Sequence, residues 1–268
     1  MRVPSRENAE ATPVKPMLTV ERGLDVLRAF RAERTGLSNA ELVRRTGLPK
    51  ATVSRITTTL VHLGYLRRIP GDRHFELGTG PLRIGYAFLE ASPLRRLAQP
   101  FMQDLADKLN VSVALAVGDR LNMLYVGYAT GRRIATLRLG VGSVLPMMAT
   151  AIGLAYVWEL PAGEQRRLLA LARQESGPDK ERIDRRVRTA FADLESIGTC
   201  FSVSGYQRDA FGIALPIRVG RQRIPMALSC GAVEIESRRD AARTRIAPEL
   251  KKAAPQLEKI LADVEDPV

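Results

Sequence analysis

The stretch SNAELVRRTGLPKATVSRITTTLVHLG, residues 38–64, determines the fold of the first part of this 268-residue chain. Ser38 and Glu41 fit the S-x-x-E capping box, in which two free backbone donors at a helix start are satisfied reciprocally. Gly47 is the residue type that ends a helix. Pro49 disfavours helix at the residue before it and suits a helix start. The stretch therefore predicts two helices joined by a tight corner.

The second helix of this pair, expected from Lys50 to Leu63, presents two contrasting sides. At about 100° per residue, one side is an apolar stripe made of Val53, Ile56, Leu60 and Leu63. The opposite side collects short, hydrogen-bonding or basic side chains, namely Ala51, Ser54, Arg55, Thr58 and His62. The helix contains no Asp or Glu, so this side can enter a DNA major groove without charge repulsion. Arg55 is long enough to reach a guanine edge.

The flanking segments complete the pattern of a winged helix-turn-helix. Upstream, Thr19 can cap a helix whose apolar side is Val20, Leu24, Leu27 and Phe30. Downstream, residues 65–69 and 73–77 alternate around a Pro-Gly-Asp turn, which predicts a β-hairpin, or wing. Its basic side chains are expected to lie along phosphates, where they add affinity but little sequence information. The simpler alternative is a helical bundle that binds another protein and has no role in DNA binding.

The net charge of the chain is +12, from 41 basic and 29 acidic side chains. Residues 17–86 contain twelve Arg or Lys against six Asp or Glu, so half of the net charge lies in about a quarter of the chain. A positive field favours polyanions such as nucleic acid or an anionic membrane. The basic residues follow the winged helix rather than an amphipathic stripe with aromatic anchors, which argues against a membrane surface.

This segment resembles the N-terminal domain of the IclR (isocitrate lyase regulator) family. The resemblance runs from Val20 to Gly85 and includes the strings VERGL at 20–24, SNAEL at 38–42, TGLPKAT at 46–52, LGYL at 63–66 and FELG at 75–78. It implies a sequence-specific transcription regulator of double-stranded DNA, with repression as the commoner mode. The candidate DNA contacts are Ser38, Lys50, Ala51, Thr52, Ser54, Arg55, Thr58, Arg67, Arg68 and Arg73.

The rest of the chain predicts a larger mixed domain after a connecting helix. Leu82, Gly85, Tyr86 and Leu89 share one helix face, and hairpin-linked strands then alternate with helices, including a strand at 134–139. That order predicts an α+β fold with an antiparallel sheet, and the resemblance implies a GAF-like effector-binding domain. The expected organisation is a flexible tail at 1–16, the winged helix-turn-helix at 17–78, a linker helix at 79–92, and an effector-binding and oligomerisation domain at 93–268.

The apolar stripe of the linker helix needs a partner, either the C-terminal domain or a second subunit, and in the resembled family the DNA-binding domains pair. We therefore expect a homodimer or tetramer, with two recognition helices about 34 Å apart on a palindromic operator. The chain has no run of about 18 apolar residues, which argues against a transmembrane helix. Its N-terminus lacks the apolar stretch of a secretory signal, and we expect a cytoplasmic protein.

The resemblance also implies a ligand pocket, where the sequence departs from the family pattern. The usual acidic position falls on Ser202, a Glu three residues later on Gly205, a frequent Cys on Gly212, and a second Ser on Gly231. These changes remove polar groups, so we expect a more apolar pocket with methionine and tyrosine walls, for an aromatic or other metabolite larger than glyoxylate. The candidate effector-binding residues are Tyr125, Leu145, Met147, Met148, Ala149, Thr150, Ala151, Ser202, Tyr206, Gly212 and Ser229.

The sequence offers no catalytic or metal centre. His62 and His74 are its only histidines, so a Ser-His-Asp triad cannot form within the C-terminal domain and a zinc site is nearly excluded. The Gly-x-Ser-x-Gly, P-loop and His-Glu-x-x-His motifs are absent. We expect no catalytic residue, no metal and no cofactor. Cys200 and Cys230 could pair, but two buried, small hydrophobic residues are the simpler expectation.

Two alternatives remain open. A non-specific or architectural nucleic-acid-binding protein would also be basic, with strong salt dependence but little preference among sequences. Its C-terminal domain would have lost ligand binding and would only dimerise. An enzyme with an appended DNA-binding domain would need a reactive constellation, for which the sequence has no motif. The effector, the operator, the target genes, the sign of regulation and the choice between dimer and tetramer stay open as well.

Overall fold

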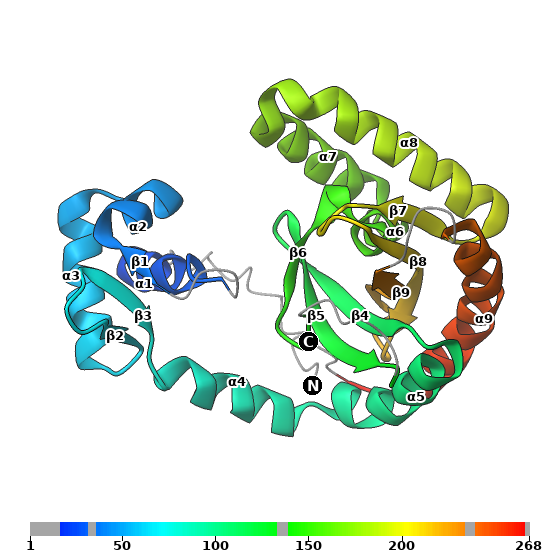
Figure 1. Ribbon diagram of the computed structural model, residues 1–268, viewed down its shortest axis with the longest axis horizontal. Coiled ribbons are helices and arrows are strands. Elements are labelled where there is room, and N and C mark those ends of the chain that lie inside the picture. Colours follow the sequence, from blue (N-terminus) through cyan, green and yellow to red (C-terminus); the bar gives the residue numbers. More distant parts are fainter. Residues whose placement is uncertain (1–16, 32–35, 133–138, 234–238, 266–268) are drawn as a thin grey trace, which may run out of the picture. The chain divides into compact units, whose positions relative to one another are not determined.

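The computed structural model describes residues 17–31, 36–132, 139–233 and 239–265 (Figure 1). It divides into two compact units between Glu90 and Ala91. The tail expected at 1–16 lies outside the described residues, and so does the strand expected at 134–139, except for Leu139. Helices and antiparallel sheets occur in both units, which confirms the α+β class.

The first unit combines three helices with a small antiparallel sheet. Strand β1 (Leu37–Ser38) pairs with β3 (His74–Leu77), and β3 pairs with β2 (Leu66–Arg68). The β2–β3 hairpin confirms the expected wing. The sequence does not indicate β1, because two residues are too few to show a period. The helices are α1 (Leu18–Arg28), α2 (Asn39–Thr46) and α3 (Lys50–His62).

An apolar core holds these helices against the sheet, and it covers less of α3 and α1 than their patterns suggest. In α3 the buried positions are Val53, Thr57 and Leu60, whereas Leu63 is 58% exposed. Helix α1 has Met17 at its N-cap, so Thr19 lies inside the helix rather than capping it. The exposed apolar residues of α1 are Leu18, Val20 and Leu24, and the rest of the core is Val26, Ala29, Leu37, Leu42, Leu66 and Phe75.

The capping box of α2 is confirmed at the atomic level. The hydroxyl oxygen of Ser38 accepts the backbone N–H of Glu41 at 3.2 Å. A carboxylate oxygen of Glu41 in turn accepts the backbone N–H of Ser38 at 2.9 Å and its hydroxyl at 3.0 Å. At the other end, Gly47 adopts the left-handed conformation (φ 68°) that closes the helix. Both ends of α2 are therefore specified by neighbouring residues.

Helix α4 (Gly80–Ala91) confirms the helix expected after the wing, and no residue of it is buried. The exposed fraction is 72% for Leu82 and 61% for Tyr86, and Ile84 and Phe88 are exposed as well. Removing apolar surface from water is favourable by about 25 cal/mol per Å². Helix α4 therefore presents an apolar surface that would gain stability from a partner.

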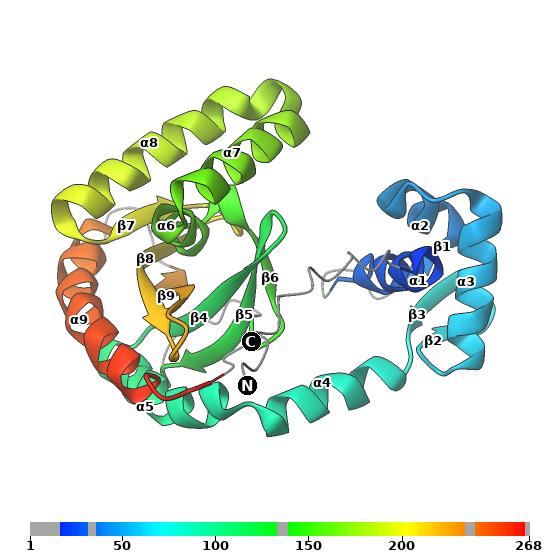
Figure 2. The same ribbon diagram turned by 180° about the vertical axis from the view of Figure 1, so that it is seen from behind.

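The second unit is a six-stranded antiparallel sheet packed between helices (Figure 1 and Figure 2), in the order β6-β5-β4-β9-β8-β7. Its strands are β4 (Ser112–Asp119), β5 (Asn122–Thr130), β6 (Val144–Pro146), β7 (Cys200–Val203), β8 (Ala210–Val219) and β9 (Ile224–Val233). Its helices are α5 (Pro93–Leu109), α6 (Ala151–Glu159), α7 (Ala162–Ser176), α8 (Lys180–Ile197) and α9 (Arg239–Ile260), with 3-10 turns at Met147–Ala149 and Gly177–Asp179. None of the helices within the described ranges is long and apolar enough to span a membrane.

Alternation along the strands separates two apolar cores on the two faces of this sheet. Val113 and Leu115 of β4 belong to the core shared with α5 and α9. Ala114 and Ala116, which alternate with them, belong to the core shared with α6 and α8. The second core thus meets smaller side chains from this strand, and that difference positions the pocket described below.

Cys200 and Cys230 are free and buried, as expected for small hydrophobic residues. They belong to different cores, Cys200 on the α6 face of the sheet and Cys230 on the α5 face. Burial raises the pKa of each thiol to about 12. The thiolate, which is the reactive form, is therefore disfavoured in the folded protein.

We expect neither cysteine to react with an aromatic disulfide reagent in the native protein at about pH 8, well below the pKa of either thiol. Labelling should require global unfolding, because both side chains are enclosed. The measurement is the absorbance of the released thiolate, with and without guanidinium. Rapid labelling of the native protein would contradict the burial of these thiols.

Replacing Ser38 by Ala should lower the free energy of unfolding by about 1 kcal/mol, because the N–H of Glu41 loses its acceptor. Urea denaturation of the full chain, followed by circular dichroism, measures the change. Ser54→Ala is the matched control, since within the described residues the Ser54 side chain makes no hydrogen bond. Equal losses from the two variants would show that the capping box adds no stability.

Candidate DNA-binding surface and ligand pocket

The side of α3 opposite the core is exposed and carries no acidic residue. Thr52 is half-buried, and the exposed candidates on this helix are Lys50, Ala51, Ser54, Arg55 and Thr58. The Thr58 hydroxyl donates to the Ser54 carbonyl at 2.9 Å, so it is partly engaged. In the described part of the chain, the side chains of Ser54 and Arg55 make no hydrogen bond or ion pair. These two can bind base edges without breaking an intramolecular bond.

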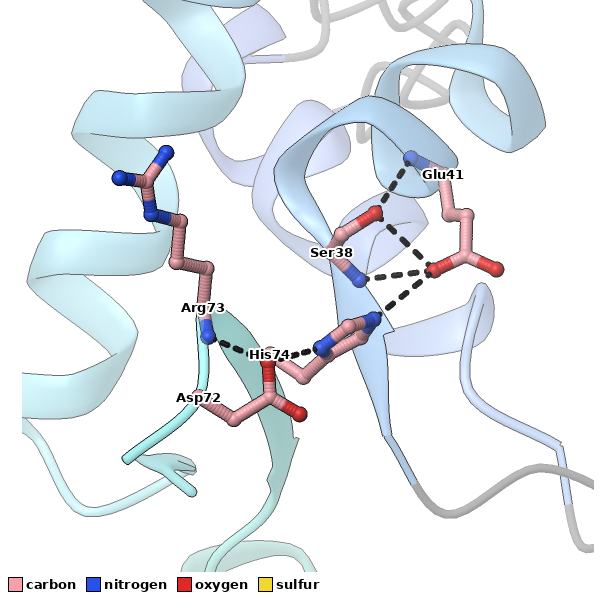
Figure 3. A network of polar contacts seen from close by, with 5 residues as sticks. All are labelled: Ser38, Glu41, Asp72, Arg73 and His74. Atoms are coloured by element: carbon pink, nitrogen blue, oxygen red, sulfur yellow. Dashed lines mark hydrogen bonds and ion pairs between the residues drawn. The ribbon is translucent and has the colours of Figure 1, made fainter. Parts of the chain in front are cut away.

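The three wing arginines differ in how they are engaged. Arg67 pairs with Glu76 across the hairpin at 2.9 Å, and the Arg68 guanidinium lies 5.0 Å from the centre of the Phe75 ring. The Arg73 side chain makes no ion pair with any described residue and points away from Asp72 and His74 in Figure 3. Exposed ion pairs and cation–π contacts are weak in water. DNA phosphates can therefore displace the partners of Arg67 and Arg68, while Arg73 can bind a phosphate without giving up an internal contact.

A network of carboxylates and an imidazole joins the wing turn to the start of α2 (Figure 3). Nδ1 of His74 lies 2.6 Å from Oδ1 of Asp72, and Nε2 lies 3.7 Å from Oε2 of Glu41. The same oxygen of Asp72 accepts the backbone N–H of Arg73 at 2.6 Å. Hydrogen bonds from His74 and Arg73 hold the pKa of Asp72 below its usual value. Ser38, a candidate DNA contact, belongs to this network through Glu41, and the sequence pattern did not reveal His74.

In the second unit, small residues form two rows across the sheet on its α6 face. The strand register aligns one row on β7, β8, β9 and β4, namely Ser202, Gly212, Gly231 and Ser112. It aligns a second row on the same strands, namely Cys200, Ala214, Ser229 and Ala114. Because neither row contains a large side chain, a hollow remains between the sheet and α6.

That hollow is a partly open pocket of about 50 Å³. Eight of the eleven candidate effector-binding residues line it, namely Tyr125, Leu145, Thr150, Ala151, Ser202, Tyr206, Gly212 and Ser229. The other three, Met147, Met148 and Ala149, line a different hollow. Sequence reasoning missed Ser112, Ile152 and Phe211, which the folding of the sheet and α6 brings to the pocket. No lining residue among those described is charged.

The hydroxyl groups around the start of α6 are engaged in internal hydrogen bonds. The Ser202 oxygen accepts the backbone N–H of Ala151 at 2.7 Å, and it thereby satisfies a free donor at the helix N-terminus. The Thr150 hydroxyl donates to the Pro146 carbonyl at 2.9 Å. Ser202 occupies the position where the resemblance places an acidic residue, and here it holds α6 to β7. The pocket wall is therefore less polar than its hydroxyl count suggests.

Tyr125 is the aromatic wall of the pocket. Burial raises the pKa of its hydroxyl above the usual value, and a hydrogen bond with Ser229 only partly offsets that effect. Its ring stacks on Tyr128, with ring centres 6.0 Å apart and planes 22° apart. The Tyr125 phenol therefore stays neutral and can act as a donor or an acceptor toward a ligand.

Two glycines set the space available in the pocket. A Cβ at Gly205 would lie 2.1 Å from the carbonyl oxygen of Ala149, which no side chain tolerates. The loop after β7 can therefore close on the turn before α6 only with glycine there. A Cβ at Gly212 would meet Cβ of Ala151 at 3.6 Å and Oγ of Ser202 at 3.8 Å, both ordinary contact distances. Position 212 has spare room, and position 205 has none.

In the described part of the chain, no group of three or more His, Cys, Asp or Glu side chains could hold a metal ion. Both histidines of the sequence lie in the first unit, and His74 is engaged with Asp72. The molecule thus combines an exposed cationic helix and wing with a partly open, largely apolar pocket.

Two family models match the chain. The IclR helix-turn-helix domain matches residues 19–70, and the bacterial transcriptional regulator IclR C-terminal domain matches residues 86–259. The proteins of this family are transcription regulators rather than enzymes.

Individual relatives agree with the family models. The HTH-type transcriptional regulator TsaQ1/TsaQ2 of Comamonas testosteroni is 32% identical over 199 residues, covering 74% of this chain and 71% of its own. The crystal structure of an IclR family transcriptional regulator from Brucella abortus superposes with a TM-score of 0.82 at 34% identity, covering 91% of this chain and 93% of its own. An IclR homologue from Microbacterium hydrocarbonoxydans, complexed with 4-hydroxybenzoate, has the same fold, with a TM-score of 0.62 at 24% identity over 91% of this chain and 98% of its own. The chain belongs to the IclR family of DNA-binding transcription regulators.

Proposed function

We propose that this regulator reads a specific DNA sequence through α3 and that a small aromatic molecule in the pocket controls its binding. The observation that carries the proposal is the exposed side of α3, which is free of acids and offers Ser54 and Arg55 without internal partners. Arg55 is suited to a guanine edge, and Ser54 can bind several base edges. Lys50 and the wing arginines supply phosphate contacts, which position the domain.

We propose a homodimer as the minimal DNA-binding species. Its support is the apolar surface left exposed on α1 and α4, which includes Val20, Leu24, Leu82 and Tyr86. Pairing of such surfaces places two copies of α3 on one face of DNA, about 34 Å apart, and predicts a palindromic operator. Two dimers can form a tetramer through other surfaces. The proposed place of action is the cytoplasm, beside chromosomal DNA, and the proposed sign is repression.

The proposed ligand has one aromatic ring and few polar groups. Its support is the uncharged lining of the pocket in the described residues, with the rings of Tyr125 and Tyr206 and engaged hydroxyl groups. The Microbacterium hydrocarbonoxydans protein, which shares the fold, binds 4-hydroxybenzoate. The present volume of about 50 Å³ is below the ~150 Å³ of a cavity that holds benzene, so binding must enlarge the pocket. Tyr206, on the loop after β7, is the most exposed aromatic wall, so its displacement would enlarge the pocket.

Such a change of shape provides the basis of control. A ligand regulates only if it binds one conformation of the protein more tightly than another. The enlarged pocket would displace the loop at Gly205 from the turn before α6. If the ligand binds the DNA-binding conformation more tightly than the alternative, it favours DNA binding; if it binds the alternative more tightly, it releases the DNA.

Arg55→Ala should weaken binding to the selected operator and relax its consensus at one position in each half-site. The expected loss is about 1–3 kcal/mol per bidentate contact, because a guanine edge loses its donors. The measurement is selection of bound duplexes from a random library by the wild type and the variant in parallel, followed by titration of the consensus.

Arg188→Ala is the matched control, since it removes the same charge from an exposed position in the second unit. It should leave the consensus unchanged. A wild-type selection that yields no consensus, together with indifference to Arg55, would overturn sequence-specific reading and favour an architectural protein.

Gly212→Val should abolish the binding of aromatic ligands in this pocket, because its γ-carbons would fill the space beyond Ala151 and Ser202. The measurement is the shift of the Tm by a panel of uncharged monocyclic aromatic compounds, such as phenols and the methyl ester of 4-hydroxybenzoate. Gly212→Ala, whose Cβ has ordinary contacts, should keep part of the shift. The aromatic assignment fails if no compound raises the Tm of the wild type, or if Gly212→Val responds as the wild type does.

A further inference from the structure

A second hollow lies on the other side of the turn that precedes α6. Pro146, Met147, Met148 and Ala149 line it, whereas Leu145 and Thr150, at the two ends of the same segment, line the first pocket. Its volume is about 430 Å³ and it opens to solvent. This hollow goes beyond the proposed function, because none of the residues that α7 and α8 contribute to it lines the first pocket.

The hollow contains an arginine that makes no direct ion pair with a described residue. Arg186 of α8 is half-buried there, one helical turn after Arg182, and neither guanidinium has an ion pair with a described residue. Two other arginines of the second unit are paired: Arg173 pairs with Asp184 at 2.8 Å, and Arg243 pairs with Asp193 at 2.9 Å. Arg186 is thus partly removed from water without such a direct carboxylate partner.

The surroundings of Arg186 disfavour its positive charge. Burial is the main cause of a lowered pKa of Arg186, the nearby charge of Arg182 adds to it, and Asp179 offsets only part of the effect. An arginine remains charged at any physiological pH. Because its surroundings disfavour that charge, a bound anion would stabilise it. A carboxylate matches a guanidinium best, through two parallel hydrogen bonds.

The other walls decide what kind of anion fits. Met147, Met148 and Ile183 are buried apolar residues that contribute to the floor of the hollow. Glu175 and Asp179 also belong to its lining, and they repel a multiply charged anion such as phosphate more strongly than a monoanion. We propose that this hollow is a second small-molecule site, which binds an amphipathic monocarboxylate with its carboxylate on Arg186 and Arg182 and its apolar body on the methionine turn.

The position of the site gives its occupant a route to the first pocket. A ligand there would press on the turn at Met147–Ala149, and the segment containing this turn also supplies Leu145 and Thr150 to the first pocket. The buried turn has little freedom to move without both sites responding. Two ligands can therefore act on one structural element from opposite sides.

The test is calorimetric titration of the full chain with sodium benzoate at constant ionic strength, using Gly212→Val to fill the first pocket. We expect Gly212→Val to bind benzoate at the second site, and Gly212→Val with Arg186→Gln to bind it at least about tenfold more weakly, as one lost charge-assisted pair requires. Gly212→Val with Arg188→Gln, which removes an exposed arginine of the same helix outside the hollow, should bind as Gly212→Val does.

Three results would overturn the proposal. One is an absence of benzoate binding to Gly212→Val, provided that its circular dichroism and Tm show a folded protein. Another is an equal affinity with and without Arg186→Gln. The third is an affinity for inorganic phosphate as high as that for benzoate, measured by competition, which would indicate a general anion site. Arg186→Lys adds a check, because it keeps the charge, loses the planar fork and should bind with intermediate affinity.

Discussion

The pairing of β8 with β9 is the constraint on which the second unit depends. Ten residues of each strand pair in register, from Ala210 opposite Val233 to Val219 opposite Ile224. Side chains alternate along a strand, so this register sends Ile213 and Leu228 to the α5 face, and Ala214 and Ser229 to the α6 face. A slip of one residue would exchange the two faces and fill the pocket with large side chains. The pocket and its apolar floor follow from that single alignment.

The second unit must enclose its functional site, whereas the first unit must expose its own. Helix α3 has to be held firmly while most of its surface stays accessible. It is anchored through three buried side chains, with Ile56 and Val61 packed partly against the same core, and its opposite side is open to solvent. Local interactions supply the orientation that the small core cannot: the capping box fixes the start of α2, and the contacts of His74 relate the wing turn to that same start. Helix and wing are thus positioned by contacts within one short stretch of chain.

Features with local causes could be predicted from the sequence, and features that depend on distant pairing could not. The capping box, the corner at Pro49 and the wing hairpin each follow from neighbouring residues, and the structure contains all three. By contrast, β1 exists only through its pairing with β3. The methionine turn was expected beside the first pocket, but its residues line the opposite side, because side-chain direction within a 3-10 turn depends on the packing of α7 and α8. The partial exposure of α1 likewise follows from how little core surrounds it.

The close approach at Gly205 has a consequence for how this pocket could have diverged. With 2.1 Å between a hypothetical Cβ and the Ala149 carbonyl oxygen, this backbone cannot accommodate the Glu that the family resemblance places there. The backbone would first have to withdraw, and the contact of the loop with α6 would be lost in the same step. A side chain at position 205 would therefore need concerted changes in the main chain of this loop rather than a gradual series of side-chain substitutions.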